Sequence, residues 1–327
     1  MLKSNVKEPI AVVLLNLGGP EKLEDVEPFL YNLFSDRQII RLGPWFMQKF
    51  IARRIAGKRA PVSMESYRLI GGGSPLARIT AEQGAALEKS LADRGVFKVS
   101  MAMRYWQPFA VDTLESLAAS GIKKIVALTL YPHYSIATTG SSLADLRKAA
   151  AASSVDFEIA AVESWPEQAD YTDCLADSIR DGAEVFGGDD FQLIYSAHSL
   201  PVKFIEEGDP YLEDLEKTIR AVEGKTGVVG RLCFQSRSGP VEWLSPSTPE
   251  MLRELADQGC RNVLAVPISF VSDHVETLYE LDIQYKDLAK EMGIRFERTA
   301  APNLNEKFIS ALRDLTLIAC CEKGWIS

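Results

Sequence analysis

His198 lies at a position that is suited to a catalytic or ligand-binding role. It follows an apolar run at 191–195 that has the length and composition of a buried parallel strand. It lies in a loop of small residues at 196–201, and in an open α/β sheet the loops at the carboxyl ends of strands face the ligand crevice. An imidazole there can accept a proton near neutral pH or bind a divalent metal ion. Spacing alone does not separate this interpretation from a histidine that only hydrogen-bonds its own loop.

Carboxylates are spaced along a segment that begins at Asp273. Asp273 and Glu276 are three residues apart, and Glu276 and Glu280 are four apart, so a helix would place all three on one face. Such a face could form an acidic track for metal entry or proton exit, and the alternative is that Asp273 caps the helix. His274 would point to another face, where we expect a supporting or structural role. Only Lys286 is close in sequence as a basic partner for these carboxylates.

The elements that must position these residues occur twice along the chain. Strands are expected at 11–15, 98–104, 124–130, 191–195, 230–235 and 262–268, and helices at 26–34, 80–94, 111–119, 141–151, 211–222, 249–258, 273–291 and 305–319. Gly121 aligns with Gly259 at an offset of 138 residues. In this register Thr138 lies opposite Glu276, so only the second half carries charge at this loop position.

This alternation of strands and helices predicts an α/β fold with parallel sheets flanked by helices. We expect two similar Rossmann-like domains, 1–152 and 153–327, with the active-site cleft between them. The junction is placed at 150–158, where a run of small residues leads into the second half. The last helix is expected to pack back on the first domain.

The segment 37–64 has an unusual composition. It contains seven basic residues and no acidic one, in a chain whose formal net charge is −9. Pro44 suits a first helical position and Gly57 suits a C-terminal cap. Large apolar side chains recur between them at helical spacing, namely Met47, Phe50, Ile51 and Ile55. Two interpretations fit: a core-facing helix with a solvated basic face, and a helix that lies on a membrane surface.

Composition argues against several classes of protein. The 327 residues are 46% hydrophobic and 25% charged, as in globular proteins with room for two domains. The net charge of −9 disfavours a general nucleic-acid binder. No apolar run reaches the roughly 18 residues that span a bilayer, and the absence of an apolar signal core at the N-terminus argues against secretion. The glycine-rich turn at 67–75 lacks the patterns of nucleotide sites.

Several blocks of the chain resemble the ferrochelatase family. The run Ser-x-His-Ser-Leu-Pro at 196–201, followed by Glu-x-Gly-Asp-Pro-Tyr at 206–211, is similar to one signature of that family, and 270–282 is similar to the other. Further matches lie at 15–20, 67–75, 104–105, 131–132 and 138–143. The resemblance implies a chelatase-like fold and a lyase that inserts Fe2+ into protoporphyrin IX with release of two protons. The product would be protohaem, made in the last step of haem biosynthesis.

The resemblance also implies roles for individual residues. His198 and Glu276 would be the catalytic and metal-binding pair, and Asp273, His274 and Glu280 would form the acidic track or support the pair. The residues that match substrate-binding positions are Arg59, Tyr67, Ser74, Arg104, Tyr105, Ile40, Trp243 and Phe270. A guanidinium suits the propionates of a porphyrin, and aromatic rings suit its pyrrole faces, although a core position fits Phe270 nearly as well.

The same resemblance bears on partners and location. The segment 37–64 resembles the hydrophobic lip over the porphyrin mouth of membrane-associated members, which implies a cytoplasmic enzyme peripherally bound to the inner membrane. This lip favours protoporphyrin over coproporphyrin III, which relatives without so apolar a lip use. A non-catalytic haem or porphyrin carrier is a third alternative, and it would not need both His198 and Glu276. The oligomeric state stays open, with a homodimer as one alternative.

No tightly bound cofactor is expected, since Fe2+ is a substrate. The five cysteines do not suggest a disulfide framework. Cys320 and Cys321 are adjacent, too close for the spaced cysteines that hold iron–sulfur clusters. Some ferrochelatases carry a [2Fe–2S] cluster on a cysteine-rich C-terminal extension, whereas this sequence ends six residues after Cys321. A [2Fe–2S] cluster is therefore not expected.

Overall fold

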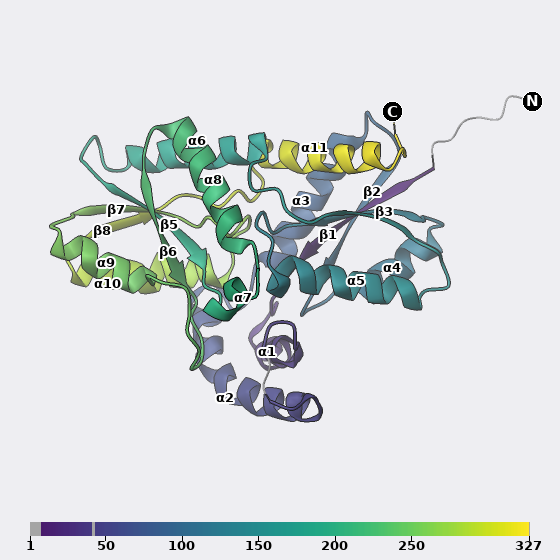
Figure 1. Ribbon diagram of the computed structural model, residues 1–327, viewed down its shortest axis with the longest axis horizontal. Coiled ribbons are helices and arrows are strands. Elements are labelled where there is room, and N and C mark those ends of the chain that lie inside the picture. The colour runs from purple at the N-terminus through teal and green to yellow at the C-terminus, as the bar shows by residue number, and fades with distance from the viewer. Residues whose placement is uncertain (1–7, 41–42, 327) are drawn as a thin grey trace, which may run out of the picture.

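The computed structural model describes residues 8–40 and 43–326. Arg41 and Leu42, which belong to the expected lip, lie outside the described residues. The described chain forms two four-stranded sheets with strand orders β2-β1-β3-β4 and β6-β5-β7-β8, and all pairs within them are parallel. Helices flank both sheets (Figure 1), so the α/β fold expected from the sequence is confirmed.

The first sheet is built around β1 (Ile10–Asn16), in which all seven residues are buried. It lies between β2 (Phe97–Met103) and β3 (Lys124–Thr129), and β4 (Glu158–Val162) forms the edge next to β3. An apolar run of this kind, buried on both faces, is typical of a central parallel strand. The helices of this half are α1 (Val26–Ser35), α2 (Gln48–Leu69), α3 (Leu76–Leu91), α4 (Ala110–Ala119) and α5 (Ser141–Ala152).

The second sheet has β5 (Gln192–His198) at its centre, between β6 (Gly230–Gln235) and β7 (Asn262–Val266), with β8 (Arg295–Arg298) outside β7. His198 is the last residue of β5 and pairs in register with Gln235, the last residue of β6. The helices are α6 (Ala169–Glu184), α7 (Val202–Glu206), α8 (Tyr211–Thr226), α9 (Thr248–Asp257), α10 (Lys286–Glu291) and α11 (Glu306–Glu322). The polar ends of β5 and β6 therefore meet at one edge.

The two halves repeat one plan, as the alignment of glycines predicts. The second sheet has the strand order of the first, shifted by four strands. Gly121 and Gly259 both adopt positive φ angles, 71° and 80°, at the turns before β3 and β7. Each of these strands leads into a π-helical segment, η3 (Ile136–Gly140) after β3 and η4 (Glu276–Tyr285) after β7. The shared π-helix shows that the repeat extends into the segments that follow these two strands.

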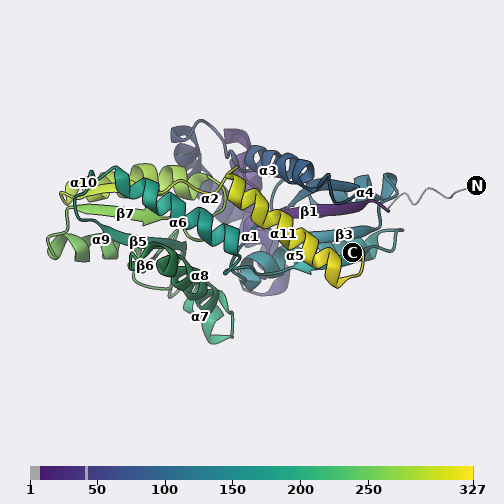
Figure 2. The ribbon, with the colours of Figure 1, turned by 90° about the horizontal axis from the view of Figure 1, so that it is seen from above.

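The expected junction between the domains needs correction. β4 pairs with β3 from Lys124↔Glu158 to Leu128↔Val162, so the first sheet extends past the expected boundary at residue 152. The helix α11 lies against α3, β3 and β4 of the first half and against α6 of the second, as the view from above shows (Figure 2).

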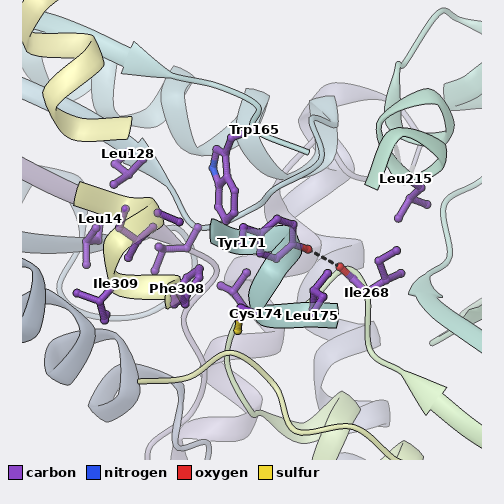
Figure 3. Close-up of a cluster of buried hydrophobic side chains, with 14 of the residues drawn as sticks. Leu14, Leu128, Trp165, Tyr171, Cys174, Leu175, Leu215, Ile268, Phe308 and Ile309 are labelled. Carbon is purple, nitrogen blue, oxygen red and sulfur yellow. Dashed lines mark hydrogen bonds between the residues drawn. The ribbon is translucent and has the colours of Figure 1, made fainter. Parts of the chain in front are cut away.

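One apolar core joins the two halves. It includes Leu14 and Leu128 from the first sheet, Tyr195 from the second, and Phe308 from α11. Around it, the hydroxyl of Tyr171 donates to the carbonyl of Ile268 at 3.1 Å (Figure 3). Because both sheets share these contacts, the edges that carry the site are held in a fixed relation.

The expected lip is a long helix that stands apart from the sheets. In Figure 1, α1 and α2 lie together below both sheets, on the side away from α11. The helix α2 continues through Gly57 to Leu69, so the expected cap at Gly57 is wrong. A Cβ at Gly57 would lie 3.4 Å from a carboxylate oxygen of Glu27 on α1. Close approach of the two helices, rather than helix termination, explains this glycine.

The face that α2 buries is made of small residues. Ala52, Ala56 and Ala60 are buried against α1, whereas Phe50 is 61% exposed. In the preceding turn, Trp45 is 78% and Phe46 69% exposed. Trp45, Phe46 and Phe50 therefore face away from the core, so the core-facing interpretation is wrong for Phe50. Ile55, by contrast, is partly buried and packs against the cluster formed with α1. Among the described residues, no helix is both long and apolar enough to cross a membrane.

Candidate active site

His198 and Glu276, which the sequence analysis paired, are in direct contact. The Nδ1 atom of His198 lies 2.7 Å from Oε2 of Glu276, the first residue of η4. The backbone N–H of His198 donates to Oγ of Ser269 at 3.2 Å, and its carbonyl accepts from the hydroxyl of Tyr211 at 3.0 Å. Because Nδ1 faces Glu276, Nε2 is on the opposite side of the ring. The residue is thus held at both backbone polar groups and at one ring nitrogen.

Each of these two side chains stabilises the charged form of the other. Burial by itself would raise the pKa of Glu276, but the charge and hydrogen bond of His198, with help from His274 and Ser236, lower it to about 2. Burial by itself would lower the pKa of His198, but the charge and hydrogen bond of Glu276 raise it above its ordinary value. The side chain of His198 is 38% exposed and that of Glu276 16%. The imidazole is therefore open to a ligand, whereas the carboxylate lies behind it.

A second carboxylate, Glu280, is joined to Glu276 by residues from the end of β6. The hydroxyl of Ser236 lies 2.8 Å from Oε2 of Glu276 and 2.7 Å from Oε2 of Glu280. The amide of Gln235 donates to the carbonyl of Glu276 at 2.9 Å and to Oε2 of Glu280 at 3.2 Å. Burial and the charge of Glu276 raise the pKa of Glu280 to about 7. Sequence analysis missed Gln235 and Ser236, although Gln235 ends a correctly expected strand next to that of His198 and Ser236 follows it.

Asp273 lies outside this pair of carboxylates. Its Oδ1 atom is 3.0 Å from Nη2 of Arg298 and accepts from the hydroxyl of Thr277 at 2.9 Å, and its Oδ2 atom accepts from Asn303 at 2.7 Å. Asp282 also binds Arg298, through two hydrogen bonds of 2.7 and 2.8 Å. The basic partner of these carboxylates is thus Arg298 at the end of β8, not Lys286, which pairs with Glu297. The expected track is reduced to Glu276 and Glu280.

His274 supports the site from behind. Its Nδ1 atom lies 3.0 Å from the carbonyl of Ser272, and its Nε2 atom is 4.0 Å from Oε1 of Glu276. Burial lowers the pKa of His274 despite the charge of Glu276, so this ring is neutral. The ring of Phe270 lies between the two histidines, with centroids 6.5 Å from His198 and 4.7 Å from His274. Phe270 therefore belongs to the wall of the site rather than to the core alone.

Arg104 and Tyr105 form a fixed unit in the first domain. The guanidinium of Arg104 donates from Nη2 to Asp36 at 2.8 Å and from Nε to Ser141 at 2.7 Å, and its centre lies 4.9 Å from the ring of Tyr105. The hydroxyl of Tyr105 donates to the same oxygen of Asp36 at 2.8 Å. Tyr105 is only 1% exposed, so it has no surface for a substrate and instead holds Arg104 in place. Sequence analysis missed Asp36 and Ser141.

Three more of the expected substrate residues, Arg59, Tyr67 and Ile40, belong to α2 or to the segment before it. Arg59 of α2 donates to the hydroxyl of Ser238 in the loop after β6, which joins the lip to the second domain. Tyr67 is 5% exposed, and its pKa is raised by burial and, to a smaller extent, by the charge of Glu276. The carbonyl of Ile40 accepts from the amide of Gln48 at 2.8 Å, so Ile40 is anchored at the start of α2.

The last two expected substrate residues, Ser74 and Trp243, lie in loops. Ser74 lines a groove of about 590 Å³ together with Asp273 of the second half. Trp243 is half-buried and pairs as an isolated bridge with Pro201, which ends the loop of His198. A separate pocket of about 580 Å³, lined by Trp165 and Asp214 among others, contains none of the expected site residues. Across 8–40 and 43–326, no three side chains of His, Cys, Asp or Glu are grouped to hold a metal ion.

Comparison with known proteins agrees with this arrangement. A model of the ferrochelatase family matches residues 9–318. The chain is 54% identical over 309 residues to a ferrochelatase of Desulfotalea psychrophila, covering 94% of this chain and 97% of the relative. It is 49% identical over 311 residues to a ferrochelatase of Geotalea uraniireducens, with 94% and 97% covered. A ferrochelatase of Gloeobacter violaceus is 43% identical over 316 residues, again with 94% and 97% covered.

Solved structures show the same fold at low identity. SirB from Bacillus subtilis with Fe3+ superposes with a TM-score of 0.56 at 12% identity, covering 98% of this chain and 99% of SirB. The sirohydrochlorin chelatase SirB from Bacillus subtilis subspecies spizizenii in complex with cobalt gives a TM-score of 0.57 at 10% identity, with the same coverage. These two structures establish the architecture, and the matches across the sequence establish the family. The chain belongs to the ferrochelatase family.

Proposed function

We propose that this chain is a lyase that inserts Fe2+ into protoporphyrin IX to form protohaem, with release of two protons. Family membership supports metal insertion into a porphyrin. The main support for this function is the contact of 2.7 Å between His198 and Glu276. In this contact a proton acceptor, His198, lies next to a negative charge that stabilises the protonated imidazole.

The proton acceptor is His198. Its Nε2 atom takes a pyrrole proton while its Nδ1–H donates to Glu276, so the imidazolium forms next to a carboxylate. A general base of this kind contributes about 10²–10⁴-fold to a rate. Because Glu276 raises the pKa of His198, an imidazole that is protonated at Nε2 must first release that proton before it can accept one from the substrate. Turnover therefore depends on a route by which protons leave His198.

The metal is received by the same two side chains. Once His198 is neutral, its imidazole and the carboxylate of Glu276 are ligands that ferrous iron accepts. Iron is a substrate here, so a pair of ligands that releases the ion into the macrocycle suits the reaction.

Arg104 is the group assigned to a propionate of the porphyrin. Two of its nitrogens are committed to Asp36 and Ser141. Its Nη1 atom lies 3.8 Å from Asp145, which is beyond hydrogen-bond distance. That nitrogen is suited to a substrate carboxylate. Asp36 balances the positive charge of Arg104. Recognition of a propionate therefore depends on the direction in which the N–H groups of Arg104 point.

We assign the lip to the membrane and to the choice of porphyrin. Trp45, Phe46 and Phe50 expose large apolar surfaces, and exposed basic residues such as Arg53 and Arg54 accompany them on α2. Aromatic and basic side chains together are typical of helices at an anionic membrane surface. This supports peripheral binding to the cytoplasmic side of the inner membrane. An apolar mouth suits protoporphyrin, with two carboxylates, better than coproporphyrin, with four.

An anaerobic insertion assay tests this function. Purified protein is supplied with Fe2+ and either protoporphyrin IX or coproporphyrin III, and metalloporphyrin is followed by absorbance. We expect faster turnover with protoporphyrin. Preference for coproporphyrin would reassign the substrate, and tight porphyrin binding without turnover would identify a carrier.

A further inference from the structure

The strand β5 extends beyond its neighbour β7, and His198 is the last residue of the extension. β7 pairs with β5 only up to Tyr195, whereas β6 pairs with it up to His198. The residue after β7 is Pro267, which has no N–H to donate to a ladder. The carbonyl of Ser196 still accepts from the N–H of Ile268 at 3.2 Å. Backbone groups two residues further along a strand face the same edge, so those of His198 face outward beyond the end of β7.

Two side chains take the place of the strand at this edge. The N–H of His198 donates to Oγ of Ser269 at 3.2 Å, and the hydroxyl of Tyr211 donates to the carbonyl of His198 at 3.0 Å. The two hydroxyls are 2.7 Å apart. A carbonyl oxygen only accepts and a tyrosine hydroxyl has one hydrogen, so Ser269 must donate to Tyr211. The three hydrogen bonds therefore form a closed ring around the backbone of His198.

The first half of the molecule fixes the position of Tyr211. Asp209, two residues earlier, accepts through Oδ1 from the N–H of Tyr211 at 3.1 Å. Its Oδ2 atom accepts from Oγ of Ser135 at 2.9 Å and from the N–H of Ile136 at 2.8 Å, at the start of η3. The aromatic ring of Tyr211 lies edge-on to the imidazole of His133, with centroids 6.1 Å apart. Contacts from both halves thus determine where the hydroxyl of Tyr211 lies.

We propose that Tyr211 is a positioning residue for metal insertion, which holds the imidazole of His198 in place through the backbone of His198. The proposal rests on the proposed function, because it concerns the group that takes the pyrrole protons. The hydroxyl of Tyr211 stays in the ring of hydrogen bonds and exchanges no proton with the substrate. The Gly-Asp-Pro-Tyr run at 208–211 thereby has two tasks, since Asp209 contacts the first half and Tyr211 contacts the loop of His198.

Accurate placement of His198 matters because its other support acts only on the ring. The contact with Glu276 fixes Nδ1, but it does not fix the backbone from which the side chain extends. Displacement of a reacting group by about 1 Å can cost about 10²-fold in rate. Loss of the backbone ring should therefore slow the reaction even though His198 and Glu276 are both retained.

The first test is Tyr211→Phe, which removes the hydroxyl and keeps an aromatic ring that is 5% exposed in the parent. Anaerobic turnover with Fe2+ and protoporphyrin IX should show a kcat about tenfold lower, for a displacement smaller than 1 Å. The KM for protoporphyrin should stay within about twofold of the parent, because substrate binding is retained. The matched control is Tyr171→Phe, which removes a hydroxyl that donates to the carbonyl of Ile268 at 3.1 Å. Tyr171 does not contact His198, so kcat of this variant should equal that of the parent.

Ser269→Ala opens the same ring from its other side and provides the second test. We expect a similar loss of kcat, again with little change in KM. The double variant Tyr211→Phe, Ser269→Ala should be no slower than the slower single variant, because one ring can be broken only once. Two independent contributions would instead multiply to about a hundredfold loss, as expected for residues that do not interact.

Four results would overturn the proposal: an unchanged kcat in Tyr211→Phe, a loss that appears in KM alone, an equal loss in Tyr171→Phe, or multiplied losses in the double variant. A parent that does not insert iron into protoporphyrin would refute the proposed function and this proposal with it. An active parent with an unaffected Tyr211→Phe variant would refute this proposal alone, so the two failures are distinguishable.

Discussion

We expect Glu276→Gln to lower turnover and Asp273→Asn to lower stability, because the two carboxylates have different partners. Glu276 stabilises a charge on His198 at 2.7 Å. Two unit charges about 4 Å apart interact by about 4 kcal/mol at an effective dielectric constant of 20. The imidazole is 38% exposed, so water screens part of this energy and about 3 kcal/mol is a better guide. Since ~1.4 kcal/mol is a factor of ten in rate, Glu276→Gln should lower kcat about 10²-fold.

Asp273→Asn should lower stability instead. Asp273 and Arg298 form a pair whose side chains are 19% and 12% exposed, and the amide of Asn303 donates to the other oxygen. Asparagine at this position removes the negative charge. Its side-chain amide group replaces one carboxylate oxygen, so that a hydrogen-bond donor faces the donor group of Asn303. A lost hydrogen bond to a charged group costs about 1–3 kcal/mol, which in a chain of 327 residues lowers Tm by about 2–4 °C. Arg298 keeps Asp282 as a partner, so turnover of the folded protein should change less than about threefold.

Anaerobic turnover and thermal unfolding of both variants on matched preparations would decide this. Glu291→Gln is the control, because it removes an exposed carboxylate from α10, which follows η4, and it should change neither quantity. If Asp273→Asn proves the more damaging to kcat, or if Glu276→Gln turns over normally, the carboxylate that serves the reaction has been assigned to the wrong residue.

Three further predictions concern protonation, the lip and the cysteines. The charge of Glu276 raises the pKa of His198 against the effect of burial, and only the neutral imidazole accepts a proton, so kcat should rise with pH above the ordinary pKa of about 6.5. Glu276→Gln should move this rise in kcat to lower pH. A pH–rate profile that is the same in the variant and the parent would contradict the role of Glu276 in setting the pKa of His198. The double variant Trp45→Ser, Phe46→Ser should sediment less with anionic vesicles than the parent does. It should keep salt-sensitive binding through the basic residues, which contribute about 1 kcal/mol each. A substitution at the exposed Val229 of the second half is the control, and unchanged vesicle binding of the double variant would show that the lip does not contact the membrane. Anaerobically purified protein should lack [2Fe–2S] absorbance and an iron–sulfur EPR signal after reduction, whereas about one cluster per chain would require a ligand set that the cysteine spacing does not suggest.

The contact between His198 and Glu276 could be predicted because it depends on strand order and loop position. His198 ends β5 and Glu276 lies in the segment after β7. Both strands are apolar and easily recognised, and adjacent parallel strands bring their carboxyl ends to one edge. The partners of Asp273 and Asp282 could not be predicted in this way. Arg298 ends a strand of four residues with one buried side chain, a pattern too short for periodicity to indicate.

The elements that were missed or misplaced have similar physical causes. β4 has a single fully buried residue, Ala160, so the first domain was expected to end before it. No element was assigned to 169–184, although Tyr171, Leu175 and Ile179 recur at the spacing of the helix α6 found there. These apolar positions were a usable signal.

The lip shows a case in which tertiary packing decides the outcome. Gly57 suggested a helix end, but α2 continues because Ala60 and Tyr67 beyond it are buried in the cluster formed with α1. One of the two interpretations of the sequence pattern would bury Phe50 in the core, whereas small residues occupy the interface with α1. The roles of Ser236 and Asp36 depend on contacts with residues 40 to 105 positions away, which no local pattern contains.

If His198 accepts the pyrrole protons during iron insertion, its removal should affect the reaction and not the fold. Anaerobic turnover of the parent and of His198→Ala is compared with Fe2+ and protoporphyrin IX, with folding checked by circular dichroism and porphyrin binding checked by fluorescence. We expect the variant to fold and to bind the free-base porphyrin but to form haem about 10²-fold more slowly or not at all. Turnover within about tenfold of the parent near neutral pH would contradict it.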